Sequence, residues 1–282
     1  MLIPRIITAL VLLPLLLAAI FCLSTLHLYL VLSVVGVAAA SEWSALMGAS
    51  APGPKIRYCI AMAIALAAAW QLNALHYGVM ALAAASLLWW LYAFKLIRGF
   101  PASFEAGPWP VEKMAPLGLL LIPATIVTLA KLHALPNGSW KLMFLFFVVF
   151  AADVGAYLVG RNYGKRKLAP AVSPGKSIEG AVGGLALVAL WAVCAGPRAF
   201  GLELEQPGQV GRLALLVLVC VITAAVSVVG DLTESLFKRL RGLKDSGTLL
   251  PGHGGVLDRI DAILAAAPTF YLGVALMGPL HP

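Results

Sequence analysis

Charged residues and glycines gather near the C-terminal end of a chain that is otherwise mostly apolar. Within residues 235–261, cations come first, and acids, an imidazole and glycines follow. These ionisable side chains are Lys238, Arg239, Arg241, Lys244, Asp245, His253, Asp258, Arg259 and Asp261. Charge is costly near a bilayer, so a charged cluster between apolar runs predicts a functional site. Its cations suit phosphates, and its carboxylates suit a hard metal ion.

Two acids in this stretch have the spacing of a cation site. Asp258 and Asp261 are three residues apart at the start of an expected helix, so they share one face. Arg259 leaves that helix in another direction and offsets their repulsion only in part. Mg²⁺ is the expected partner, because it takes one or two carboxylates together with water and substrate phosphate oxygens. Gly254 and Gly255 would let the backbone approach a ligand closely.

A second polar group lies further upstream, inside an apolar run. Asp153, Tyr157 and Arg161 are four residues apart, which places them on one helix face. Asp153 could be a structural carboxylate paired with a cation of a neighbouring helix. The cost of an acid within a membrane favours a contact to metal or substrate instead.

The segment 161–180 combines basic residues with a Ser-Pro turn. Ser177 is placed to cap a helix starting near Ile178, which would leave free N–H groups facing an anion. Ser173 and Lys176 would lie beside that anion. The P-loop pattern is absent, so any phosphate cradle here is of another kind. An anchor on lipid headgroups is the alternative.

Asp231 and Glu234 follow the eighth apolar run. Their spacing fits the cap of a short helix over 232–243, with leucines on one side and cations around the rest. Such a basic amphipathic helix would lie on an anionic membrane surface. Asp231 could also bind a metal, because its two oxygens can serve different roles.

These groups must be positioned by membrane helices. The 282-residue chain is 61% hydrophobic and only 11% charged, whereas soluble domains carry roughly 25% charged residues. Continuous apolar runs near the length of a bilayer core predict an all-α polytopic helix bundle of about nine transmembrane helices. The runs are Ile6–Leu23, Leu28–Met47, Ile56–Leu72, Val79–Ile97, Ala115–Ala130, Trp140–Gly160, Ala181–Ala195, Leu213–Gly230 and Ile260–Met277.

The distribution of charge predicts an orientation and a division of labour. Nine spans place sixteen of the 20 Lys and Arg residues on the side of the N-terminus, so this side is expected to be cytoplasmic. The net charge of +8 suits anionic lipid, and no nucleic acid partner is expected. Acids are sparse before residue 141. We therefore expect residues 1–140 to form a scaffold and lipid-facing shell, with Trp109 as an interfacial anchor. We expect residues 141–282 to form the catalytic region, with cytoplasmic loops 161–180 and 231–259.

The chain resembles the phosphatidate cytidylyltransferases, also called CDP-diacylglycerol synthases. The family's D-x-x-A-Y and S-P-x-K-[ST]-x-E-G elements look like Asp153–Tyr157 and Ser173–Gly180, and Gly175 stands where many members carry a basic residue. The family's long C-terminal pattern is also filled at every specified position. Those positions are Ser235, Lys238, Arg239, Lys244, Asp245, Gly247, Leu250, Pro251, His253, Gly254, Gly255, Asp258, Arg259 and Asp261.

The resemblance implies transfer of a cytidylyl group from CTP to phosphatidate, giving CDP-diacylglycerol and pyrophosphate. It implies Mg²⁺, with K⁺ as a further candidate, and a homodimeric enzyme of the bacterial inner membrane with its active site on the cytoplasmic side. We expect Asp231, Asp258 and Asp261 to hold the metal. Cations and neighbouring polar groups would hold substrate: Lys238, Arg239, Lys244 and Arg259 on phosphates, Ser173, Lys176 and Ser177 as a second wall, and Asp153, Tyr157, Ser235, His253, Gly254 and Gly255 around them.

Two other functions share some of these features. A CTP-dependent polyprenol or lipid kinase would transfer a single phosphate instead of CMP. A transporter of an anionic solute would place charges at the middle of the membrane, whereas here they gather at one edge. A CDP-alcohol phosphotransferase would need a D-G-x2-A-R run, which the chain lacks.

Overall fold

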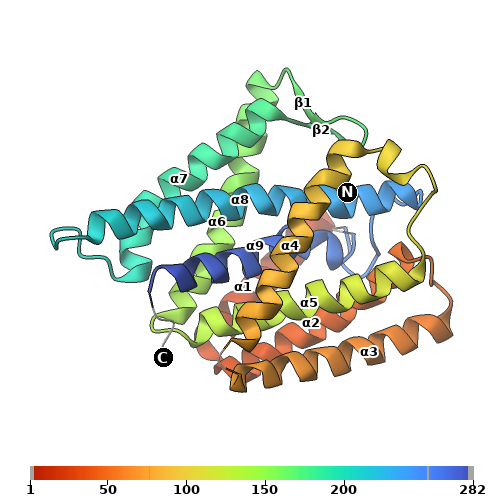
Figure 1. Cartoon of the computed structure of the whole chain (residues 1–282), viewed down its shortest axis with the longest axis horizontal. Coiled ribbons are helices and arrows are strands. Elements are labelled where there is room, and N and C mark those ends of the chain that lie inside the picture. Colours follow the sequence, from red (N-terminus) through yellow and green to blue (C-terminus); the bar gives the residue numbers. More distant parts are fainter. Residues whose placement is uncertain (1–2, 76, 253, 279–282) are drawn as a thin grey trace.

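A computed structural model describes residues 3–75, 77–252 and 254–278, and Figure 1 shows a bundle of helices with one small hairpin. The α-helices of the described residues are α1 (Ile3–Cys22), α2 (Thr25–Leu46), α3 (Pro52–Gln71), α4 (Gly78–Gly99), α5 (Val111–Ala134), α6 (Gly138–Tyr163), α7 (Ile178–Phe200), α8 (Gln209–Leu240) and α9 (Leu257–Leu276). Two 3₁₀ turns, η1 (Leu72–Ala74) and η2 (Ala102–Phe104), follow α3 and α4. The antiparallel strands β1 (Lys167–Ala169) and β2 (Ser173–Ser177) connect α6 to α7.

The predicted helical membrane fold is confirmed. Each predicted apolar run overlaps one helix, and in the described part of the chain eight helices are long and apolar enough to cross a membrane. The apolar part of α1, Leu10–Cys22, is shorter. The three shortest predicted runs belong to helices of 20, 24 and 23 residues, because helical backbone continues past the apolar stretch at their ends. Nine spans and the orientation of the N-terminus remain predictions.

Helix α8 corrects the prediction of a separate surface helix over 232–243. It runs unbroken for 32 residues, and Asp231 lies inside it rather than at a cap. Leu232, Leu236 and Phe237 are buried. This burial stabilises a continuous helix, and nothing after Gly230 breaks it. The loop expected over 231–259 therefore begins only at residue 241.

The N-terminal half contributes to the core, which the description of a lipid-facing shell does not anticipate. Helix α5 is the most buried of the eight membrane-length helices and packs against α2, α3, α4, α6 and α9. The Thr125 hydroxyl in α5 donates to the Leu264 carbonyl of α9 at 3.1 Å. The least buried spans are α3 and α7, one from each half, so both halves supply core and surface.

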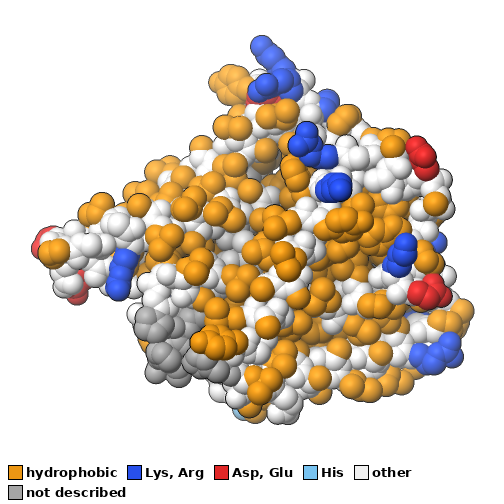
Figure 2. Space-filling model, in the orientation of Figure 1, with side chains coloured by type: hydrophobic (Ala, Val, Ile, Leu, Met, Phe, Trp, Pro, Cys, Tyr) orange, Lys and Arg blue, Asp and Glu red, His pale blue; other side chains and the backbone are white. Residues whose placement is uncertain are grey.

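The surface is apolar around the middle of the bundle. Figure 2 shows hydrophobic side chains across most of the visible face, with Lys and Arg mainly at its upper and right margins. In the same orientation, the β1–β2 hairpin lies at the top of Figure 1. An apolar belt with cations near its edge suits a protein surrounded by lipid.

Candidate active site

The C-terminal acids meet where α8 packs against the start of α9. Asp231 and Glu234 lie in α8, and Asp258 and Asp261 lie in the first turns of α9. Gly230 makes this possible, because a Cβ there would press on the Asp261 carbonyl. The charges of Asp231 and Glu234 consequently act on the Asp261 carboxyl. The expected convergence of these acids is therefore seen, and it depends on a glycine contact between two helices.

Lys238 lies between two of these carboxylates. Its Nζ donates to Glu234 Oε2 at 2.8 Å and to Asp258 Oδ1 at 2.7 Å, and all three side chains are largely buried. A buried ion cluster of this kind is destabilised strongly when one member is removed, because the remaining charge loses its partner. Lys238 thus has a structural role in this arrangement, and its expected contact with a substrate phosphate stays a prediction.

Asp258 organises the loop that precedes α9. Its Oδ2 accepts hydrogen bonds from the backbone N–H of Ser246 at 2.9 Å and of Gly255 at 2.8 Å. Lys238 occupies Oδ1. Gly254 has φ +84° and its backbone passes close to the Asp258 carboxylate. Gly254 and Gly255, which were expected to approach a ligand, therefore lie against carboxylates of the protein itself.

The acids can be tested for their fit to Mg²⁺. No three His, Cys, Asp or Glu side chains of the described residues are grouped closely enough to hold one ion by themselves. Asp231 and Asp261 are neighbours, and the adjoining Glu234 Oε1 is buried without a hydrogen-bond donor. Asp231 and Asp261 fit Mg²⁺, which completes its shell with water and substrate phosphates, provided that Lys176 releases Asp231. Asp258 fits less well, because buried Lys238 and the backbone N–H groups of Ser246 and Gly255 bind its oxygens.

The β1–β2 hairpin supplies the opposite wall. Lys176 in β2 reaches across to α8, where its Nζ donates to Asp231 Oδ2 at 2.6 Å. Ser177 is the predicted N-cap of α7, and its Oγ accepts from the Gly180 N–H at 3.1 Å. At the same helix end, Glu179 accepts from the backbone N–H groups of Lys165 and Arg166. The expected cap is confirmed. Glu179 also holds the segment after α6 against the first turn of α7.

A cavity of about 350 Å³ lies between α6, the hairpin and α7, and we call it the polar cavity because charged side chains line part of it. Asp153, Tyr157 and Arg161 line it from α6, as their spacing predicted, and Lys176 lines it from β2. The Arg161 guanidinium donates to the Tyr157 hydroxyl at 3.1 Å. Asp231 and Lys176 lie close enough to Asp153 for their charges to act on its carboxyl group. A cavity with both signs of charge suits a polyanion accompanied by a cation.

Several expected substrate contacts do not line this cavity. Arg239 donates weakly to the Val172 carbonyl at 3.4 Å, and Lys244 and Arg259 are exposed. Ser173 is partly buried in β2, and the Ser235 hydroxyl bonds Asp231 Oδ1 at 3.4 Å. His253 lies outside the described residues. The expected roles of these side chains on substrate stay predictions.

Glu42 in α2 is a site-supporting residue that the sequence reasoning missed. It is buried, and its carboxylate accepts from the Ser246 hydroxyl at 3.2 Å, the Val256 N–H at 3.1 Å and the Leu257 N–H at 2.8 Å. A Cβ on Gly255 would overlap both Glu42 and Ser246. Glu42 thereby satisfies the exposed N–H groups at the start of α9. Its position as a lone acid within an apolar run is the signal that could have found it.

Arg241 ties the end of α8 to the N-terminal half. Its guanidinium donates to the carbonyls of Leu46 at 2.8 Å, Met47 at 2.7 Å and Trp109 at 3.0 Å. The Trp109 ring packs against Phe237 of α8 and other aromatic rings. Trp109 therefore belongs to an aromatic cluster packed against α8, and its expected role as an interfacial anchor stays a prediction.

The fold and site define a polytopic membrane protein with buried acids and lysines at one end of its helices. The sequence profile of the cytidylyltransferase family matches residues 3–277. The chain belongs to this family. It is 40% identical over 268 residues to a phosphatidate cytidylyltransferase of Pseudomonas aeruginosa, covering 94% of each chain. It is 35% identical over 290 residues to the enzyme of that name from Haemophilus influenzae, covering 94% of this chain and 96% of the relative. A Brucella suis phosphatidate cytidylyltransferase is 47% identical over 137 residues, 49% of this chain and 47% of its own.

Proposed function

We propose that this protein transfers a cytidylyl group from CTP to phosphatidate, releasing pyrophosphate and giving CDP-diacylglycerol. The observation that carries the proposal is similarity over nearly the whole chain to proteins named phosphatidate cytidylyltransferase. The cavity formed by Asp153, Lys176 and the nearby Asp231 supports it, because a nucleoside triphosphate needs cations for its phosphates and acids for an accompanying metal.

The reaction requires the protein mainly to position the two substrates. A phosphate oxygen of phosphatidate attacks the α-phosphorus of CTP, and the bond from that phosphorus to the bridging oxygen of the β-phosphate breaks. The nucleophile is already ionised, so no strong general base is required. Catalysis then depends on alignment and on neutralising negative charge, as in other phosphoryl transfers.

Lys176 is the residue best placed to bind a CTP phosphate. It lines the polar cavity, and its Nζ donates to Asp231 Oδ2 on the facing helix at 2.6 Å. Substrate phosphate can replace Asp231 as the acceptor, which releases that carboxylate toward a cation. Asp231 and Asp261 would hold Mg²⁺, and the ion would neutralise the phosphate charge. Lys238 holds Asp258 and Glu234 in place beside them.

A direct assay separates this activity from its alternatives. Purified protein is incubated with phosphatidate micelles, Mg²⁺ and CTP labelled either at the α- or at the γ-phosphate. We expect α-label in the lipid extract, no γ-label there, and loss of turnover with EDTA. Lipid carrying γ-label would indicate a lipid kinase. If neither form of labelled CTP gives labelled lipid, and the protein instead carries a solute into proteoliposomes, a transporter would be favoured.

The location and assembly of the enzyme complete the proposal. We place it in the bacterial inner membrane with the site facing the cytoplasm, because the cations concentrate on that side. A single cysteine in the loop after α6, in a variant lacking native Cys22, Cys59, Cys194 and Cys220, should react with an impermeant reagent only after the membrane is opened. Homodimers should appear as twice the chain mass in light scattering. Stimulation of turnover by K⁺, measured against Na⁺, tests the second cation.

A further inference from the structure

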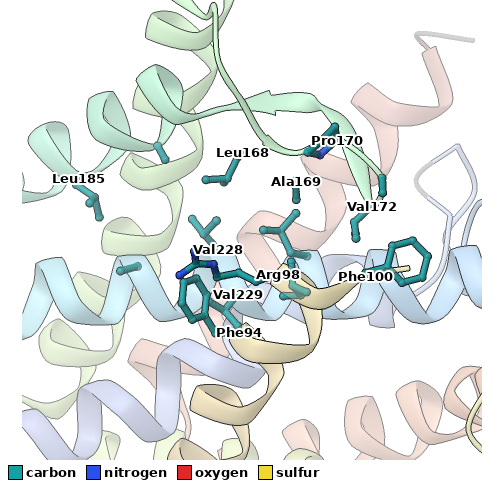
Figure 3. Close-up of a pocket in the computed structure, with 15 residues that line it drawn as sticks. Phe94, Arg98, Phe100, Leu168, Ala169, Pro170, Val172, Leu185, Val228 and Val229 are labelled. Carbon is teal, nitrogen blue, oxygen red and sulfur yellow. The ribbon is translucent and has the colours of Figure 1, made fainter. Parts of the chain in front are cut away.

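A second cavity, distinct from the polar one, lies beneath the β1–β2 turn between α4, α7 and α8. Its volume is about 460 Å³, within the ~300–1,000 Å³ typical of small-molecule sites. The residues that line it are apolar apart from one arginine, and they include Phe94 from α4, Leu185 from α7 and Val229 from α8 (Figure 3). The hairpin turn covers it with Pro170 and Val172. Such walls fit a hydrocarbon chain.

Arg98 is the exception in this cavity. It is the one charged residue among those that line it. Its guanidinium lies 5.7 Å from the centre of the Phe94 ring, and the described residues offer it no carboxylate partner. Figure 3 shows the side chain extending toward Val228. An exposed arginine without an acid, beside an apolar hollow, matches an amphiphile with an anionic head.

The two cavities are continuous in their walls. Leu168, Ala181 and Val228 line both of them. Because the Arg98 side chain extends toward Val228 in Figure 3, its guanidinium faces the wall that the apolar cavity shares with the polar cavity. A lipid with its chain in the first and its phosphate at the boundary would present that phosphate to a nucleotide in the second.

We infer that the apolar cavity holds an acyl chain of the lipid substrate and that Arg98 binds the lipid phosphate. This inference rests on the proposed function and adds a specificity-determining residue from the N-terminal half of the chain. It assigns the two substrates to different cations, with the lipid on Arg98 and CTP on Lys176. Because the residues lining this cavity are apolar apart from Arg98, the acyl chain would stay in a hydrocarbon environment while the phosphate reacts.

The experiment measures the KM of each substrate separately in mixed micelles. Wild-type turnover is established first, so that its absence would count against the proposed function alone. Arg98→Ala should raise the KM for long-chain phosphatidate about tenfold, the loss expected for one charge-assisted contact, and leave the KM for CTP within about twofold. Arg98→Lys should recover part of the loss. Lys95→Ala, a neighbouring cation of α4 that lines neither cavity, should match the wild type.

A second variant tests the acyl chain without touching a charge. Ala225→Trp fills the apolar cavity from α8 and should raise the KM for long-chain phosphatidate several-fold more than for dihexanoyl phosphatidate, because fewer buried methylenes are displaced from the short lipid. Leu218→Trp, at an exposed position of the same helix, is the matched control. Equal effects on both lipids, or no effect, would mean that only bulk lipid or detergent fills the cavity and would overturn the inference. A rise in the KM for CTP in Arg98→Ala would also overturn it.

Discussion

The two halves of the chain meet the site in different ways. Helices α6 to α9, with the hairpin between α6 and α7, provide the groups that would touch CTP phosphates and metal, including Asp153, Lys176, Asp231 and Asp261. Helices α1 to α5 instead provide a buried acceptor, Glu42, and the carbonyls that bind the end of α8. The C-terminal half therefore carries the groups proposed to act on CTP and metal. The N-terminal half holds these groups in position and adds Arg98 for the lipid. Substitutions in the two halves should therefore differ in their effects on activity and on stability.

The largest expected effect tests the ion cluster at the centre of the C-terminal half. Lys238→Ala leaves Glu234 and Asp258 buried without their cation, so we expect a loss of about 3–5 kcal/mol in the free energy of unfolding. An SDS titration of the detergent-solubilised protein measures it. Lys244→Ala, which removes an exposed cation, should change stability little. Equal stability of the two variants would show that the cluster is not a structural element.

Asp231→Asn should separate chemistry from stability. This substitution keeps the shape of the side chain while removing the charge that faces Lys176 and Asp261. We expect kcat to fall about 10²–10³-fold, comparable to removal of a group that stabilises developing charge, with the SDS midpoint nearly unchanged. Glu203→Gln, at the connection between α7 and α8, is the matched control. Wild-type turnover in Asp231→Asn would remove this residue from the proposed mechanism.

Glu42→Ala tests whether the N-terminal half positions the site. Its loss leaves the Ser246 hydroxyl and the N–H groups of Val256 and Leu257 without their acceptor, at about 1–3 kcal/mol for an unsatisfied buried group. We expect kcat to fall about tenfold with KM for CTP less affected, and Glu42→Gln to recover part of the activity. Glu112→Ala, an exposed acid of the same half, should behave as the wild type. A purely structural role for Glu42 would lower stability and leave the kinetics of the folded enzyme unchanged.

A pair of glycines sharpens the comparison at a smaller scale. A methyl group on Gly255 would overlap Glu42 and Ser246, whereas one on Gly175 meets open space. Gly255→Ala should therefore destabilise the protein by about 1–3 kcal/mol, as overpacking does, while Gly175→Ala should alter the SDS midpoint little. If Gly255→Ala were equally stable, the loop before α9 would be more adjustable than the contacts indicate.

The smallest effect concerns the polar cavity itself. Gly175 lines this cavity beside Lys176, and a Cβ added there would meet open space. Gly175→Lys adds a cation with room to move, and we expect the KM for CTP to fall about two- to fivefold, in line with a partly exposed ionic contact. Gly175→Gln controls for side-chain length. An unchanged KM would place the nucleotide phosphates away from this end of the hairpin.

The sequence allowed local features to be predicted well. Continuous apolar runs marked the helices because lipid leaves the backbone no other partner, and Ser177 was identifiable as a cap because capping depends on neighbouring residues only. Contacts between distant segments were harder. The junction at Gly230 looked like a helix end because charge begins there, and only the packing of α9 explains the continuity of α8. Glu42 was missed because its partners are more than 200 residues away.

The unbroken course of α8 has a consequence for the depth at which the reaction takes place. Val228 belongs to the walls of both cavities, and Asp231 follows it by three residues, or about 4.5 Å along the axis. Less than one turn of continuous helix therefore separates the apolar part of the site from its acids, and no hinge lies between them. The backbone geometry of α8 therefore fixes the level of the lipid headgroup relative to the acids. This level changes only when the whole helix tilts or slides.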